Sequence, residues 1–305
     1  MTQNNVLKGV FLVALGATSY GMLATFVKIA YNEGFTTAEV TTSQFVYGLI
    51  GLLLVNLIQQ RQSKKEEVKA TQKNVLQLII AGSSTGLTSL FYYLAVKYIP
   101  VSIGIVLLMQ TVWMGVLLEW ILDKKAPSLQ KTIAVFIVLI GTGLAINIFK
   151  IDFQDTSIDW SKGIFWGLLA AASFTTTMFT ANRIAVHVSA ARRSLLMLIG
   201  GAIIVFSFAL VTQVTPFNFE IFMKWGIFLA LFGTIIPPLL LNAGFPHTGI
   251  GLGSIVASLE LPVSVLMAYF LLHEQVLLIQ WLGIILIISA IVIMNLNFKK
   301  STKLI

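Results

Sequence analysis

The residue with the clearest chemical potential in this 305-residue chain is Glu260, an acid within a long apolar segment. About eight residues of helix separate it from the start of that segment, which places its carboxylate roughly 12 Å deep in a bilayer. An acidic side chain at that depth costs about 2.5 to 3.5 kcal/mol unless it is paired, protonated or facing a wet cavity. Two interpretations stay open: a cavity or coupling role, or a structural contact that fastens two helices.

The surroundings of Glu260 favour a cavity wall with a flexible helix beside it. Pro262 cannot donate a hydrogen bond to the carbonyl of Ser258, so the helix is weakened near the acid. Pro237 and Pro238 form a second bend, and these three prolines are the predicted hinges. Small or polar side chains share the helical face of Glu260: Gly253, Ala257, Ser264 and Ala268.

Lys28 is the only basic residue well inside an apolar segment. It lies three residues from one end, so its four-carbon stem can reach the membrane interface by snorkelling. Alternatively, Lys28 contributes to the cavity or its outer gate, where it binds an anionic group or pairs with Glu260. We expect Lys28→Ala to depress transport without loss of membrane abundance if the second interpretation holds.

Further polar and aromatic side chains recur at helical spacing in the apolar segments. For each of them alone, helix packing is the favoured interpretation, because hydroxyl groups bond preceding carbonyls and small residues pack helices. Together they suggest an amphipathic pocket whose aromatic faces can hold apolar or cationic groups. The predicted cavity residues, besides Lys28 and Glu260, are Tyr20, Tyr92, Gln110, Trp113, Trp166, Thr177, Asn242 and Ser264.

Other motifs carry little functional weight. The glycines at 249, 251 and 253 follow no strand, and the segment 82–86 lacks the lysine of a phosphate loop. The three histidines have no metal-ligand spacing and cysteine is absent, so we expect no metal, no cofactor and no catalytic residue. Glu119, near the inner end of its segment, is expected to face Lys124 or Lys125.

The composition places these residues in a membrane protein. Hydrophobic residues make up 57% of the chain and charged residues only 10%, against about 25% charged in soluble proteins. A net charge of +8 can indicate nucleic-acid binding, but here the charges lie in short connectors between apolar segments. Nucleic acid is therefore excluded as a partner, and lipid is the expected solvent.

The predicted fold is all-α, with ten transmembrane helices of roughly 20 residues each. The predicted segments are 9–31, 38–58, 75–96, 101–122, 131–149, 163–183, 194–213, 225–246, 252–272 and 277–297. With the N-terminus inside, 15 of the 20 basic residues fall in inside connectors, including Arg192 and Arg193. The positive-inside rule then predicts cytoplasmic termini, and we expect a multi-pass protein of the plasma membrane.

The two halves of the chain resemble each other in sequence. Ala17-Thr18-Ser19-Tyr20 matches Ala171-Ala172-Ser173-Phe174, and Gln44 with Leu49-Ile50-Gly51 matches Arg193 with Leu198-Ile199-Gly200. Residues 1–150 and 151–305 are therefore interpreted as two five-helix repeats. Because five is an odd number, the second repeat is inverted, as in many secondary transporters whose substrate site lies at the midplane.

Two stretches of sequence also resemble a known family. These are the run from Tyr93 to Val101, followed by Gly141-Thr142-Gly143, and the sequence Leu259-Glu260-Leu261-Pro262, followed by Leu271-Leu272-His273-Glu274. They are similar to the repeats of the drug/metabolite transporter superfamily, in its ten-helix EamA-type branch. Val112 and Lys124 in the first half, and His273 and Gln44, depart from the usual pattern. The resemblance implies a central cavity lined by the first, third and fourth helices of each half, and export or exchange of amino acids, amines or related metabolites.

The function expected from the sequence is secondary transport by alternating access, without enzymatic activity. Glu260, with Lys28, would bias substrate or proton occupancy. The alternatives are a flippase or an intramembrane enzyme acting on lipid-linked intermediates, and a channel or scaffold. The expected partners are a small-molecule substrate and the lipid bilayer. A homodimer is one of the assemblies compatible with the sequence.

Overall fold

The computed structural model describes residues 3–62, 70–151, 158–273 and 275–296, and within these ranges the regular structure is entirely helical. The first half of the chain contains α1 (Gln3–Asn32), α2 (Thr37–Gln62), α3 (Gln72–Tyr98), α4 (Val101–Leu108), α5 (Thr111–Asp123) and α6 (Leu129–Ala145). A short helix, η1 (Ile148–Lys150), follows. The predicted fold class, an all-α membrane protein of ten spans in two inverted five-helix repeats, is confirmed.

The second half repeats this plan. It contains α7 (Trp160–Arg183), α8 (Ala190–Thr212), η2 (Phe222–Gly226), α9 (Ile227–Ala230), η3 (Leu231–Ile235), α10 (Ile236–Thr248), α11 (Ile250–Ala257), α12 (Glu260–Leu271) and α13 (Leu278–Leu296). The eighth span is the continuous run from η2 to α10, in which η2 and η3 are π-helical turns. The fourth and ninth spans, predicted as single helices, are instead the pairs α4–α5 and α11–α12.

Length and composition agree with ten crossings of a bilayer. Eight of the spans in the described residues are long and apolar enough to cross a membrane, and the remaining two, α6 and α13, are shorter apolar helices. Large apolar side chains are exposed on the outside of the bundle, for example Phe11, Leu54 and Phe136. In water such a surface would be unfavourable, so the outer face is suited to lipid.

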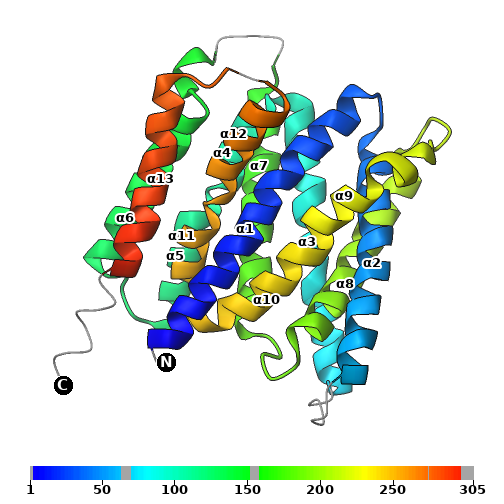
Figure 1. Cartoon of the computed structure of the whole chain (residues 1–305), viewed down its shortest axis with the longest axis horizontal. Coiled ribbons are helices and arrows are strands. Elements are labelled where there is room, and N and C mark those ends of the chain that lie inside the picture. Colours follow the sequence, from blue (N-terminus) through cyan, green and yellow to red (C-terminus); the bar gives the residue numbers. More distant parts are fainter. Residues whose placement is uncertain (1–2, 63–69, 152–157, 274, 297–305) are drawn as a thin grey trace.

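Figure 1 shows α1 beginning and α13 ending at the same side of the bundle, here called the termini side, and the opposite side is called the far side. Helices pack mainly against the other half of the chain. The first span, α1, lies against α10 and α12, and the sixth span, α7, lies against α3 and α4. Since the same pairing recurs with the halves exchanged, the centre of the bundle is built jointly by both repeats.

Glycines permit the closest of these helix contacts. A side chain at Gly82 or Gly86 of α3 would collide with the backbone of Met197 or Gly201 in α8. The glycines at 82 and 86 therefore serve the packing of two helices, which gives this motif a structural explanation in place of phosphate binding. Side chains of Thr71, Ser128, Asp159 and Ser189 accept hydrogen bonds from backbone amides at the starts of α3, α6, α7 and α8.

Candidate functional site

Two membrane spans are interrupted at equivalent places in the two halves. In the fourth span the interruption lies at Met109 and Gln110, and in the ninth span it lies at Ser258 and Leu259, 149 residues later. The backbone hydrogen bonds match, because the Val112 amide donates to the Met109 carbonyl at 3.1 Å and the Leu261 amide donates to the Ser258 carbonyl at 3.2 Å. Interrupted helices in corresponding positions of inverted repeats mark the binding sites of many transporters.

The interruption in the ninth span presents Glu260 as the first residue of α12. The positive end of the helix dipole therefore lies at this acid, which favours a negative charge there. Pro262 lies in the first turn of α12, where its missing N–H leaves no helical hydrogen bond unmade. The proline thus allows the helix to restart after the interruption, and the break itself lies three and four residues before it, at Leu259 and Ser258.

Helix α1 approaches Glu260 closely. A Cβ atom placed on Gly21 would lie 2.5 Å from the Glu260 carbonyl oxygen and 2.7 Å from Cβ of Val263. Only a glycine allows the two backbones this separation, so Gly21 fixes the level at which α1 meets α12. The side chain of Glu260 is half-buried there.

Tyrosine side chains surround the acid. The charge of Glu260 acts electrostatically on the hydroxyl groups of Tyr20, from α1, and Tyr92, from α3. Tyr20 contacts Phe174 edge to face with ring centroids 6.0 Å apart, and Tyr92 contacts Tyr93 in the same way at 5.9 Å. Three of the predicted cavity residues, Tyr20, Tyr92 and Glu260, are therefore brought together, from three different helices.

Lys28, predicted to contribute to the cavity or to pair with Glu260, lies near the far end of α1. Lys28 is exposed, and it lies seven residues beyond Gly21 on α1, a rise of roughly 10 Å along the helix. Its pairing with Glu260 therefore stays a prediction. Its position at the end of α1 fits the other two interpretations, snorkelling or a role at the outer opening.

Gln110 and Trp113, also predicted as cavity residues, interact with each other at the first interruption. The Gln110 amide donates to the Val106 carbonyl at 3.0 Å, and the Trp113 ring N–H donates to Oε1 of Gln110 at 2.9 Å. Trp113 is 37% exposed. Gln110 thus bonds a carbonyl that precedes the break, and the structure gives it no contact with Glu260.

A small cavity continues from the tyrosine cluster toward the termini side. It has a volume of about 20 Å³ and includes three predicted residues, Tyr20, Thr177 and Asn242, together with Pro238. Asn242 is only 3% exposed, and its Nδ2 donates to the Ser194 hydroxyl at 3.0 Å. Its Oδ1 is buried and has no hydrogen-bond partner among the described residues.

The remaining predicted residues lie around this centre. Trp166 stacks on Phe91 with ring centroids 5.5 Å apart, on the α3–α7 contact. Ser264 is half-buried, one turn beyond Glu260 on α12. Pro237 and Pro238 occupy the first turn of α10, directly after the π-helical turn η3. The eighth span therefore departs from regular α-helical hydrogen bonding at the predicted hinge.

The sequence interpretation missed Arg193, which it assigned to an inside connector. The structure places this side chain within α8 at 1% exposure, between α7 and α10. Its guanidinium donates to the backbone carbonyls of Asn242 (2.8 Å), Thr180 (3.1 Å), Ile184 (3.1 Å) and Ala181. Its match to Gln44 in the other repeat is the signal that could have placed it inside the bundle.

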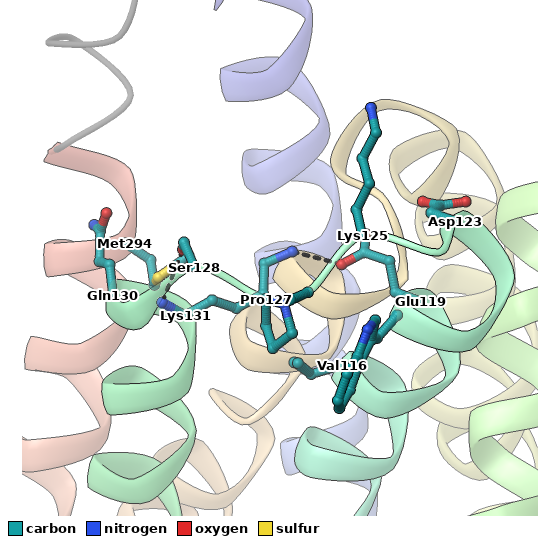
Figure 2. Close-up of a pocket in the computed structure, with 11 residues that line it drawn as sticks. Val116, Glu119, Asp123, Lys125, Pro127, Ser128, Gln130, Lys131 and Met294 are labelled. Atoms are coloured by element: carbon teal, nitrogen blue, oxygen red, sulfur yellow. Dashed lines mark hydrogen bonds and ion pairs between the residues drawn. The ribbon is translucent and has the colours of Figure 1, made fainter.

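A second, larger pocket of about 410 Å³ opens between the ends of α5, α6 and α13. Figure 2 shows the ion pair in its wall, in which Nζ of Lys131 lies 2.5 Å from Oε2 of Glu119. The expected partners of Glu119, Lys124 and Lys125, are thus wrong: Lys124 ends α5 in a left-handed conformation, and α6 turns back to bring Lys131 to the acid.

The same carboxylate explains two of the glycines after α10. A Cβ atom on Gly249 would lie 2.6 Å from Oε1 of Glu119, and one on Gly251 would collide with Oε2. Glu119 therefore lies against the first turn of α11, and these glycines make room for an acid and not for a nucleotide.

The two halves of the ninth span are packed very differently. All eight residues of α11 are buried, whereas only Leu261 and Pro262 are buried among the twelve residues of α12. Since α11 runs from the termini side to the centre and α12 continues to the far side, the ninth span is enclosed by protein on the termini side of the centre. It is more loosely covered toward the far side.

Comparison with known proteins was made for the sequence and for the fold. The profile of the EamA-like transporter family matches residues 7–147 and 161–296. No curated protein matches the sequence. One solved crystal structure of a protein with 13% sequence identity superposes with a TM-score of 0.76, covering 96% of this chain and 99% of that chain. At this identity the likeness concerns the fold.

Proposed function

Because the chain belongs to the EamA-like transporter family, we propose that it is a secondary transporter that carries small metabolites with an amino group through the centre of the bundle. Amino acids and amines are the substrate class. The observation that carries this proposal is Glu260, a carboxylate at an interruption of the ninth span, with tyrosines from two other helices beside it.

This chemistry suits an ammonium group. A carboxylate supplies the opposite charge, and aromatic faces attract cations by about 0.5 to 2 kcal/mol, more when water is excluded. A polar residue within a membrane span is usually retained for substrate or proton handling. We infer that Glu260 binds either the substrate cation or a proton, and that this competition couples transport to a proton gradient.

Alternating access would follow from the two inverted halves. The buried α11 and the loosely covered α12 support a state closed toward the termini side and open toward the far side. With cytoplasmic termini, as the charge distribution favours, this state faces outward. Export is the direction that we propose, with a proton entering Glu260 from the far side as substrate leaves.

The alternatives need other arrangements. An intramembrane enzyme would need a second acid or a histidine beside Glu260 at the same depth, and the neighbours that the structure describes are tyrosines. A flippase for lipid-linked intermediates would use the same fold, so only a transport assay separates it from a metabolite carrier.

The proposal is tested by transport into proteoliposomes under an imposed pH gradient. Radiolabelled amines and amino acids are the probes, with a fluorescent polar lipid as a separate arm. We expect wild-type transport of an amine or amino acid to rise with the gradient, and Glu260→Gln to lose this dependence. Glu220→Gln is the matched control, because Glu220 is a surface acid on the far side. Movement of the lipid alone, or an unchanged gradient dependence in Glu260→Gln, would contradict the proposal.

A further inference from the structure

Arg193 carries a positive charge that no acid neutralises among the described residues. Its guanidinium is enclosed by four backbone carbonyls, three of which belong to the end of α7 and the residue after it, and one to α10. Arginine stays protonated in proteins even when buried. The negative end of the α7 dipole offsets part of this charge, about half of an elementary charge, and the remainder acts on the surrounding bundle.

The charge lies beside a small cavity that extends from the centre toward the termini side. Asn242 connects the two features, since its carbonyl accepts from Arg193 and its side chain lines the 20 Å³ cavity. The lining of the cavity includes Tyr20, a neighbour of Glu260, and Ser194, which follows Arg193 in sequence. Its volume exceeds the roughly 10 to 15 Å³ that one water molecule needs.

Water in such a cavity would let protons leak through a proton-coupled carrier without any substrate. The lining of this cavity is mainly apolar, and its polar members are Tyr20, Thr85, Thr177, Ser194 and Asn242. A single water molecule bonded to such groups would suffice to carry a proton. Hydrogen-bonded groups of this kind pass protons. A proton arriving at Glu260 from the far side could then leak through a carrier that is closed to its substrate.

We propose that Arg193 is an electrostatic barrier that keeps protons and other cations from passing this cavity to the termini side. A fixed positive charge in a medium of low dielectric constant repels a second cation strongly, and pores use arginines to exclude cations in this way. The carbonyl bonds hold the guanidinium in place, and its charge closes the path. This role is independent of the substrate and of the direction of transport.

The test is passive proton entry into proteoliposomes without any substrate, driven by a potassium diffusion potential and reported by an internal pH dye. We expect Arg193→Gln to raise proton entry about tenfold, the factor that roughly 1.4 kcal/mol of repulsion gives. Arg193→Lys should restore most of the barrier, because lysine keeps the charge but loses the planar set of donors. Arg192→Gln, a change of the neighbouring residue outside the carbonyl cage, should leave proton entry at the wild-type value.

A second variant decides the matter if Arg193→Gln fails to fold. Asn242→Asp keeps the arginine and its carbonyl bonds but places a negative charge beside it, so it should also raise proton entry. If Arg193→Gln folds and its proton entry equals that of the wild type, the proposal is overturned. If Arg193→Gln does not fold, wild-type proton entry in Asn242→Asp overturns it. Equal leakage in Arg193→Lys and Arg193→Gln would overturn it too, since the hydrogen bonds alone would then maintain the seal.

Discussion

The two interrupted spans share a backbone break but differ in chemistry. At the first, between α4 and α5, a neutral Gln110 donates its amide hydrogen to the Val106 carbonyl. At the second, between α11 and α12, Glu260 starts the new helix and Pro262 follows. Because the break forms without a proline in the first half, it belongs to the architecture of the repeat. The charge and the proline are specific to the second half, and we propose the charged break as the binding site.

The largest expected effect comes from making the first break resemble the second. Gln110→Glu loses the amide donor and directs a carboxylate toward the Val106 carbonyl. We expect the free energy of unfolding to fall by about 3 kcal/mol, the cost of an acid at the centre of a span. Thermal denaturation in detergent measures this. Gln110→Met, which loses the bond without adding a charge, should cost about 1 kcal/mol, and equal stability of the two variants would remove the distinction between the breaks.

A smaller effect is expected where the first helix of each half meets an interrupted span. Gly21→Ala brings a Cβ atom within 2.5 Å of the Glu260 carbonyl oxygen, which belongs to a backbone and cannot turn away. Gly167→Ala in α7 meets only the side chain of Leu107, which can change rotamer. Unfolding experiments should therefore show a loss of about 2 kcal/mol for Gly21→Ala and under about 1 kcal/mol for Gly167→Ala. A reversed order would contradict the close contact of α1 with α12.

Removing the charge at the second break should stabilise the protein while it abolishes coupling. Glu260→Gln removes a half-buried carboxylate from the middle of a span, so we expect a gain of about 1 kcal/mol in the free energy of unfolding. The melting temperature of purified protein at neutral pH reports it. A clear loss of stability would show that Glu260 fastens two helices, the structural interpretation that the sequence left open.

The smallest effect is expected from Pro262→Ala. The proline lies in the first turn of α12, where alanine also fits, and the other half breaks at the same place without one. The change in the free energy of unfolding should stay under about 1 kcal/mol. Hydrogen exchange should show that the amides around Ser258 and Leu259 remain as exchangeable as in the wild type. Strong new protection there would mean that the proline makes the break.

The helices were predictable because the membrane imposes length and composition on each span. The prolines also pointed to the right regions, although the residues that form the breaks precede them. Tyr20, Tyr92 and Glu260 were identified by their polarity in apolar segments, and they lie near one another. These are properties of single residues or of single helices, which a sequence displays directly.

The misassigned residues depend on contacts between helices. Arg193 was counted as a surface charge because it lies near the end of its span, and its carbonyl partners come from two other helices. Glu119 pairs with Lys131, and not with Lys124 or Lys125, because α6 turns back toward the end of α5. Such partners follow from helix positions, which no local pattern encodes.

The π-helical turns of the eighth span have a mechanical consequence. Each π turn contains one residue more than an α-helical turn. Moving such an insertion by one residue along the chain would rotate the intervening segment by about 100° about its own axis. The π-helical turn η3 directly precedes α10. If the extra residue of this turn shifted along the chain, the side chains that it passed would rotate toward or away from the centre of the bundle, and only a few backbone hydrogen bonds would change at each step.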